Sequence, residues 1–156
     1  ALVESKAQGL NFLLSVLCLV WAADIGAYFG GKAFGRRKLA PSISPGKSWD
    51  GVWSGMVAVC VLAALWIWVD GQLGVDSPSL YSRLWMGLGP LGMLLALAFL
   101  VAMSVVGDLF ESLVKRQAGV KDSSQLLPGH GGVLDRIDAL LPTLPLTLAV
   151  LTLCHA

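Results

Sequence analysis

The chain has 156 residues, of which 56% are hydrophobic and only 13% are charged, with a formal net charge of +1. Ordinary soluble domains contain about 25% charged residues, so this composition excludes a typical soluble protein and favours helices embedded in a bilayer. The near-neutral net charge gives no reason to expect a nucleic acid as partner.

The first apolar stretch covers residues 10–29, and twenty helical residues reach about 30 Å, enough to cross a bilayer. Asp24 interrupts this stretch. An acid inside a span is costly and is by default a candidate functional residue. A position near headgroups, or a partner on a neighbouring helix, would explain Asp24 equally well, so its role stays open.

A loop rich in Gly, Pro and basic residues follows at Gly30–Gly51. Tight turns are predicted at Ala40-Pro41 and at Ser44-Pro45-Gly46. The basic residues alone could be the positive flank of a membrane protein, but that reading leaves the Gly and Pro content unexplained. Residues 44–48 also suit a turn that faces phosphate, although their spacing is not that of a Walker A loop.

Residues 52–69 and 84–106 are the second and third predicted spans, and residues 70–83 between them are expected to be a connector without chemistry. Glycines and Pro90 in the third span suit close helix packing or a kink. The third helix is expected to continue beyond its apolar part, because polar residues recur there at i, i+3, i+4 and i+7. These are Asp108, Glu111, Ser112 and Lys115.

The stretch Ser112–Asp138 is the most polar part of the chain and combines three features that fit phosphate chemistry. A basic cluster can meet phosphate oxygens, a Gly-rich turn can bring backbone N–H groups to an anion, and two carboxylates at i and i+3 can hold a hard cation. The residues are Lys115, Arg116 and Lys121; Pro128 to Gly132; and Asp135 and Asp138.

A fourth apolar run, broken by Pro142 and Pro145, predicts a last span at residues 139–155. The predicted fold is therefore all-α: a polytopic integral membrane helix bundle whose polar loops form the active site. We expect residues 1–156 to be one membrane-embedded catalytic domain. Because the chain begins with Ala1, we expect it to be the C-terminal part of a longer protein.

The charge distribution predicts the orientation of the bundle. Nine of the eleven Lys and Arg residues lie in 32–47 and 115–136. Alternation of the first three spans places both stretches on one side of the membrane, which the positive-inside rule makes cytoplasmic. Both polar stretches then face the same compartment, as a composite active site requires.

Residues 112–138 resemble the signature of the phosphatidate cytidylyltransferase family, also called CDP-diacylglycerol synthases. The match includes Ser112, Lys115-Arg116, Lys121-Asp122, Pro128, His130-Gly131-Gly132 and Asp135-Arg136-Ile137-Asp138. A second stretch of the family is similar to residues 24–29, Gly35, residues 38–41 and residues 44–51. The resemblance covers about residues 21–141, and the signature at residues 112–138 shows no departure from the family's pattern.

The resemblance implies a Mg²⁺-dependent membrane enzyme, with a second cation left open, that makes CDP-diacylglycerol and pyrophosphate from CTP and phosphatidate. It implies a homodimer in a bacterial inner membrane, with the active site on the cytoplasmic side. The metal ligands would be Asp108, Asp135 and Asp138. The catalytic residues would be Asp108, Lys115, Arg116, Lys121, His130 and Asp135, and the residues that bind the nucleotide would be Ser44, Lys47, Gly131 and Gly132.

The chemistry of such a reaction does not require His130 to act as a general base. The attacking phosphate has a second pKa of about 6 and is already ionised near neutral pH, so a strong general base is not required. We therefore expect His130 to donate a hydrogen bond to phosphate, the alternative being a turn histidine bonded to the backbone.

Two other functions are compatible with parts of the sequence. A CTP-dependent lipid kinase would share the polar loops but release CDP instead of pyrophosphate. A transporter would explain Asp24 within a span and the glycine-rich helices. Against a transporter, the polar residues gather in loops on one side and do not follow a path across the membrane.

Overall fold

A computed structural model describes residues 1–73, 75–120 and 137–154. The fold is the expected all-α membrane helix bundle, with one short β-hairpin added. Its elements are α1 (Leu2–Ala7), α2 (Leu10–Phe34), β1 (Lys38–Ala40), β2 (Ser44–Ser48), α3 (Trp49–Gln72), α4 (Leu80–Gln117) and α6 (Leu140–Cys154).

Three helices, α2, α3 and α4, are long and apolar enough to cross a membrane, with 25, 24 and 38 residues. Each extends beyond the span predicted for it. The last helix, α6, has 15 residues, which is shorter than the roughly 20 that a straight span requires. The fourth span therefore stays a prediction.

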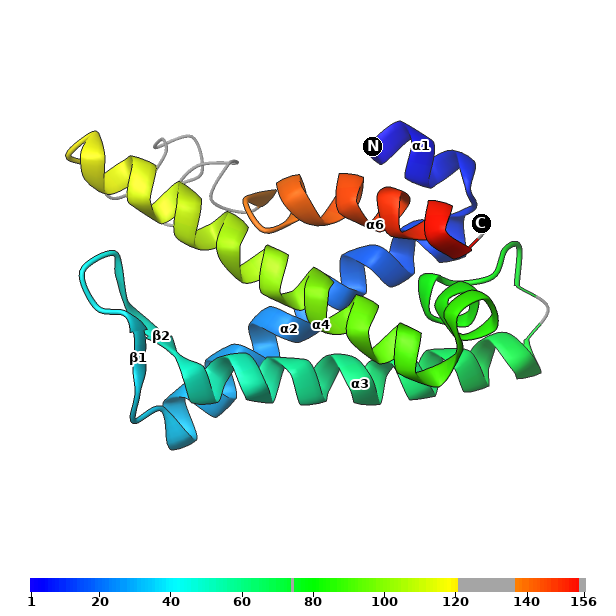
Figure 1. Cartoon of the computed structure of the whole chain (residues 1–156), viewed down its shortest axis with the longest axis horizontal. Helices are drawn as coiled ribbons and strands as arrows, with labels where there is room; N and C mark the ends of the chain where they lie inside the picture. Colours follow the sequence, from blue (N-terminus) through cyan, green and yellow to red (C-terminus); the bar gives the residue numbers. More distant parts are fainter. Residues whose placement is uncertain (74, 121–136, 155–156) are drawn as a thin grey trace.

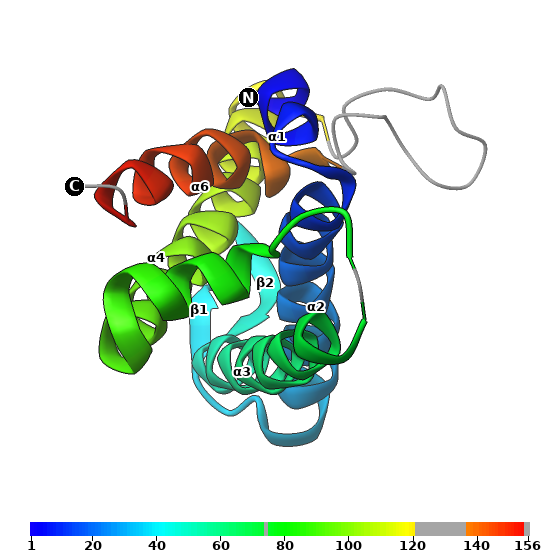
Figure 2. The same ribbon diagram turned by 90° about the vertical axis from the view of Figure 1, so that its right-hand side faces the viewer.

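The elements separate the molecule into two ends (Figure 1). The hairpin β1–β2 and the C-terminal part of α4 lie at one end, whereas α1, the C-terminal part of α6 and the connection from α3 to α4 lie at the other. Figure 2 looks nearly along α3 and shows α2 and α4 on different sides of it. The two polar stretches of the sequence thus begin at the same end of the bundle.

Helices α2 and α3 approach closely because small residues line their contact. A Cβ atom at Gly55 would lie 2.6 Å from the carbonyl oxygen of Ala23, and one at Gly26 would lie 2.9 Å from the Cα atom of Gly55. A Cβ atom at Gly30 would overlap the side chain of Ser54, 1.9 Å from its Oγ. Small residues that let backbones meet are typical of helix contacts in membranes.

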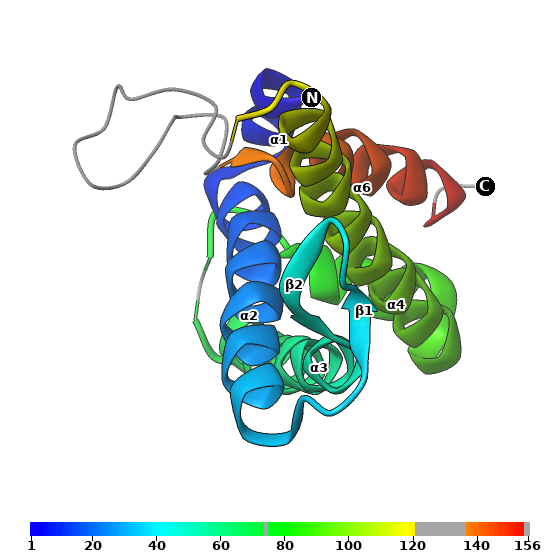
Figure 3. The ribbon, with the colours of Figure 1, turned by 90° about the vertical axis from the view of Figure 1, so that its left-hand side faces the viewer.

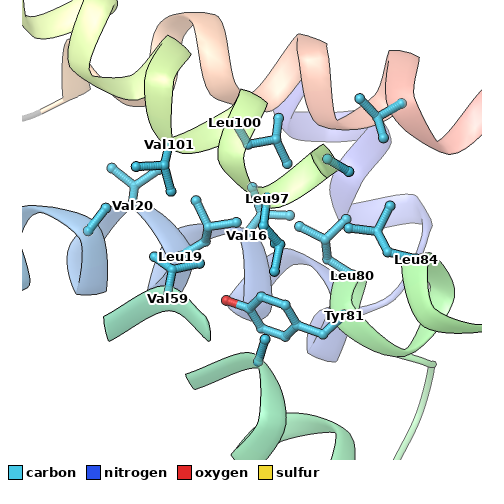
Figure 4. Packing of buried hydrophobic residues seen from close by; sticks show 14 of the residues in the cluster. Val16, Leu19, Val20, Val59, Leu80, Tyr81, Leu84, Leu97, Leu100 and Val101 are labelled. Carbon is cyan, nitrogen blue, oxygen red and sulfur yellow. The ribbon is translucent and has the colours of Figure 1, made fainter. Parts of the chain in front are cut away.

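The hydrophobic core lies where α2, α3 and α4 cross (Figure 4). Tyr81, at the start of α4, is fully buried in this core, and its ring centroid lies 6.0 Å from that of Trp66 on α3. Its hydroxyl group donates a hydrogen bond to the carbonyl oxygen of Ser15 (3.1 Å), and the Oγ of Ser15 accepts one from the N–H of Leu80 (2.9 Å). These bonds fix the start of α4 against α2 and satisfy polar groups that are buried.

The connection from α3 to α4 holds a polar network instead of a featureless loop. Asn11 donates through Nδ2 to the carboxylate of Asp70 (2.9 Å) and accepts a bond from Nε1 of Trp66 (2.9 Å). Asp70 also accepts from the Oγ of Ser82 (2.6 Å). The carboxylate of Asp76 accepts from the first N–H groups of α2, 2.8 Å from the N of Leu10, and so caps that helix. This end of the bundle is therefore locked by side chains from α2, α3 and α4.

The predicted loop Gly30–Gly51 is largely ordered secondary structure. Helix α2 continues to Phe34, and the turn predicted at Ala40-Pro41 is confirmed by a bond from the N–H of Ile43 to the carbonyl oxygen of Ala40 (3.2 Å). The prediction of a turn at Ser44-Pro45-Gly46 is wrong, because these residues belong to strand β2, where Ser44 pairs with Ala40 of β1 and the register is irregular. In a two-stranded ribbon both strands are edges, which is where a Pro without an N–H group is tolerated.

Helix α4 has the kink and the extension that the sequence indicates. Gly89 has φ 70° and ψ −178°, which interrupts the helix just before Pro90. Beyond its apolar part the helix continues to Gln117 and carries Asp108, Glu111 and Lys115. The long C-terminal part of α4 therefore brings its polar face to the end of the bundle where the hairpin lies (Figure 3).

The close contact of α2 and α3 predicts a large effect of one methyl group. Gly55→Ala should lower the free energy of unfolding by about 2 kcal/mol, because the added Cβ would overlap the backbone of Ala23 and force overpacking. Gly71→Ala in the same helix is the matched control, since a Cβ there meets no atom within 4 Å. Thermal unfolding in detergent measures both, and equal midpoints for the two variants would contradict the packing described.

Candidate functional site

An ion pair joins the two polar stretches of the chain. The Nζ of Lys47, on β2, contacts the Oδ2 of Asp108, on α4. The side chains of Lys47 and Asp108 are 24% and 32% exposed, so water screens their attraction only in part. Two residues that the sequence assigns to one site are thus in direct contact.

Short-range bonds at the start of α3 fix the position of Lys47. The next residue, Ser48, is the N-cap of α3 and accepts a hydrogen bond from the N–H of Gly51 (3.1 Å). The N–H of Trp49 donates to the carbonyl oxygen of Arg37 (3.0 Å), and the N–H of Arg36 donates to Asp50 (3.0 Å). The hairpin is therefore attached to the first turn of a spanning helix, which limits where Lys47 can reach.

The ion pair borders a cavity of about 320 Å³ between α2, the hairpin, α3 and α4. Figure 3 shows the hairpin between the C-terminal parts of α2 and α4. The hairpin contributes mostly polar groups to the cavity, whereas the helices contribute mostly apolar residues, apart from Asp24 of α2 and Asp108 of α4. Its lining residues are Ala23, Asp24, Ala27, Tyr28, Ser44, Gly46, Lys47, Ser48, Gly51, Val52, Gly55, Val101, Val105 and Asp108.

Three carboxylates lie around this cavity. Asp24 and Asp108 line it, and Asp24 is within electrostatic range of Asp108, of Lys47 and of Asp138. The backbone of Asp138 packs against Gly107, the residue before Asp108, where an added Cβ atom would lie 2.8 Å from the Asp138 carbonyl oxygen. The carboxylate of Asp138 accepts a hydrogen bond from the N–H of Ala139 (2.7 Å). Three acids against one lysine leave an excess of negative charge among these four residues.

This excess of negative charge is carried by carboxylate oxygens, which are ligands that suit a divalent cation. Mg²⁺ takes oxygen ligands and usually needs only one or two carboxylates together with phosphate and water. Two of the three predicted ligands, Asp108 and Asp138, belong to the group around the cavity, while Asp135 lies outside the described residues. Within the residues that the structure describes, no three His, Cys, Asp or Glu side chains are close enough to hold a metal by themselves.

The other predicted site residues fall in three groups. Ser44 lines the cavity beside Lys47. Lys115 lies further along α4, with its Nζ 3.5 Å from Oε1 of Glu111, and the adjacent Arg116 is exposed. Lys121, His130, Gly131, Gly132 and Asp135 lie outside the described residues.

The structure draws attention to two residues that the sequence did not assign to the site. Tyr28 lines the cavity although it is 63% exposed, and it packs edge-on against Phe29 with ring centroids 5.3 Å apart. Its spacing of four from Asp24 places both on one face of α2, a signal that the sequence already contained. Glu111 is the second, because it is only 7% exposed despite its charge.

A sequence model described as the cytidylyltransferase family matches residues 1–154. The chain belongs to this family. Proteins named phosphatidate cytidylyltransferase are among its relatives, and the chain spans about half the length of these curated relatives. That of Haemophilus influenzae is 52% identical over 138 residues, covering 88% of this chain and 44% of the relative. That of Pseudomonas aeruginosa is 53% identical over 145 residues (93% and 48%), and that of Bacillus subtilis is 41% identical over 145 residues (93% and 49%).

A solved structure supports the fold of this family member. It is described as an intramembrane enzyme for archaeal membrane lipids biosynthesis, and the match has a TM-score of 0.54 with 18% identity. The match covers 90% of this chain and 78% of that one. The likeness concerns the fold, and the three helices that are long and apolar enough to cross a membrane support an integral membrane protein.

If the Lys47–Asp108 ion pair holds the hairpin against α4, removing it should make the hairpin easier to cleave by a protease. Asp108→Asn should let trypsin cleave after the exposed residues Arg36, Arg37 and Lys38 about two- to fivefold faster. That factor corresponds to about 0.5–1 kcal/mol for a partly exposed ion pair. Asp24→Asn is the control, because it removes a charge from the same cavity and keeps the Lys47–Asp108 pair. Unchanged cleavage of Asp108→Asn would show that the pair does not hold the hairpin.

Proposed function

We propose that this chain forms the active site of a phosphatidate cytidylyltransferase, which transfers the cytidylyl group of CTP to phosphatidate and releases pyrophosphate. The observation that carries the proposal is the cavity where Lys47 of the hairpin meets Asp108 of α4. The names of the relatives support the choice of substrates.

The cavity combines the two environments that this reaction needs. A phosphate oxygen of the lipid attacks the α-phosphorus of CTP, so two polyanions must be brought together and the main obstacle is their repulsion. The polar side, with Lys47, Ser44 and the backbone of Gly46, suits phosphate groups. The apolar side, with Val101 and Val105 of α4, suits the part of the lipid next to its headgroup.

Positioning and charge neutralisation then supply most of the catalysis. Lys47 exchanges its contact with Asp108 for a phosphate group of CTP. Lys115 and Arg116, further along α4, and Lys121 offset the remaining negative charge. His130 donates a hydrogen bond to phosphate, and no side chain has to remove a proton from a nucleophile that is already ionised.

Mg²⁺ would be held by Asp108 and Asp138 together with Asp135. When bound, it lowers the repulsion between phosphates and stabilises the charge on the leaving pyrophosphate. The fit rests on the oxygen ligands and on the negative charge around the cavity. A second cation belongs to the same proposal.

The proposal includes a place for the site in the cell. The end of the bundle with the hairpin carries the basic residues of α2, β1, β2 and the end of α4, which the positive-inside rule assigns to the cytoplasm. We place the protein in a bacterial inner membrane with its site open to cytoplasmic CTP. The homodimer is proposed from the family resemblance.

The fate of the phosphates of CTP tests the proposed function. With phosphatidate and Mg²⁺, label at the α-phosphorus of CTP should enter the lipid product, while label at the γ-phosphorus should leave as pyrophosphate. A CTP-dependent lipid kinase would instead place the γ-label on the lipid and release CDP. Thin-layer chromatography of the two labelled reactions separates these outcomes, and γ-label in the lipid would refute the proposal.

A further inference from the structure

The C-terminal part of α4 is amphipathic, with polar and apolar residues on opposite faces of the helix. Asp108, Glu111 and Lys115 follow at i, i+3 and i+7 and share the polar face. Phe110 and Val114, on the opposite side, are 66% and 47% exposed. Because Asp108 lines the cavity, the face that carries Glu111 and Lys115 continues from the cavity toward the end of the helix.

Glu111 is buried more deeply than the other residues of this face. Its side chain is 8% exposed, that of Lys115 is 18% exposed, and the Nζ of Lys115 lies 3.5 Å from its Oε1. An exposed pair of this spacing stabilises a helix only weakly. Burying a carboxylate away from water carries a much larger desolvation cost unless a partner compensates it. The Glu111–Lys115 pair therefore differs from an ordinary exposed pair on a helix surface.

The position of the pair relates it to the cavity. Seven residues of an α-helix rise about 10 Å, so Lys115 lies about that far along α4 from Asp108. Lys47 is at Asp108. Under the proposed function, the linked phosphates of the nucleotide would extend from Lys47 toward Lys115, and Glu111 lies between these two points along the same face of α4.

An acid between two lysines that bind phosphate would weaken binding if it acted on the phosphates alone. We propose that Glu111 is a positioning residue, whose carboxylate holds the ammonium group of Lys115 on the polar face of α4 where it meets the phosphates of the nucleotide. This inference rests on the proposed function. It assigns a part in binding to a residue that touches no substrate.

A double-mutant cycle in pyrophosphate binding tests the inference. The affinity of the protein in detergent for labelled pyrophosphate with Mg²⁺ is measured by equilibrium dialysis for wild type, Glu111→Gln, Lys115→Met and the double variant. Each single variant should bind about tenfold more weakly, and the double variant should bind no more weakly than Lys115→Met, since coupled residues are not additive. Glu4→Gln, at the other end of the molecule, is the control and should bind as wild type does.

Three results would overturn the inference. Tighter binding by Glu111→Gln would show that the acid only repels phosphate, multiplied losses in the double variant would show independent action, and no pyrophosphate binding by wild type would remove the site. If Glu111→Gln does not fold, Glu111→Asp replaces it, because it keeps the charge but shortens its reach by one methylene. With Glu111→Asp, unchanged binding, or losses that multiply with those of Lys115→Met, would overturn the inference. These results stand apart from the labelled-CTP experiment because neither CTP nor lipid is present.

Discussion

The contact between Lys47 and Asp108 is the interaction on which the shape of the site depends. It is a direct side-chain link between the hairpin, which is attached to α3, and α4, and it lies at the edge of a cavity whose other walls are largely apolar. Charges in such surroundings are costly unless they are paired, so the two side chains neutralise each other when no substrate is bound. Under the proposed function, Lys47 binds a phosphate group and Asp108 binds a cation when substrate is present. Each charge then has a new partner, so neither is left unpaired.

Rigid structure on both sides of the cavity keeps this contact in place. Glycines such as Gly26 and Gly55 let α2 and α3 meet at backbone distance, and the cap at Ser48 joins the hairpin to α3. At the opposite end, Asn11 and Asp70 tie α2 and α3 together. A site held in this way needs little rearrangement to receive a substrate, and fixed polar groups of this kind contribute most to reactions between charged partners.

Some of this arrangement could be predicted from the sequence because it depends on local patterns. The apolar stretches indicate the long helices, Gly89 and Pro90 indicate the kink, and the spacing of Asp108, Glu111 and Lys115 indicates the extension of α4. The strand at Ser44-Pro45-Gly46 could not be predicted, because Pro and Gly favour a turn locally. In the structure, pairing with β1 and the cap at Ser48 hold this segment extended. Contacts between distant residues, such as Asn11 with Asp70 or Lys47 with Asp108, could not be predicted either. The alternation of the spans predicts only on which side of the membrane a residue lies, not which residue it contacts. The family resemblance predicts that Lys121, His130 and Asp135 belong to the site, and this stays a prediction because these residues lie outside the part of the chain described.

The most direct test of this account is the chemical reactivity of individual lysines with and without CTP. The protein in detergent is treated briefly with an amine-reactive ester, and the modification of each lysine is followed by mass spectrometry. With saturating CTP and Mg²⁺, the modification of Lys47 should slow markedly, because its ammonium group lies against phosphate in the cavity. Lys38, exposed on β1, and Lys6, exposed at the other end of the molecule, should react as before. If Lys47 reacts at the same rate with and without saturating CTP, the nucleotide does not bind at the junction of the hairpin and α4, and the account is wrong.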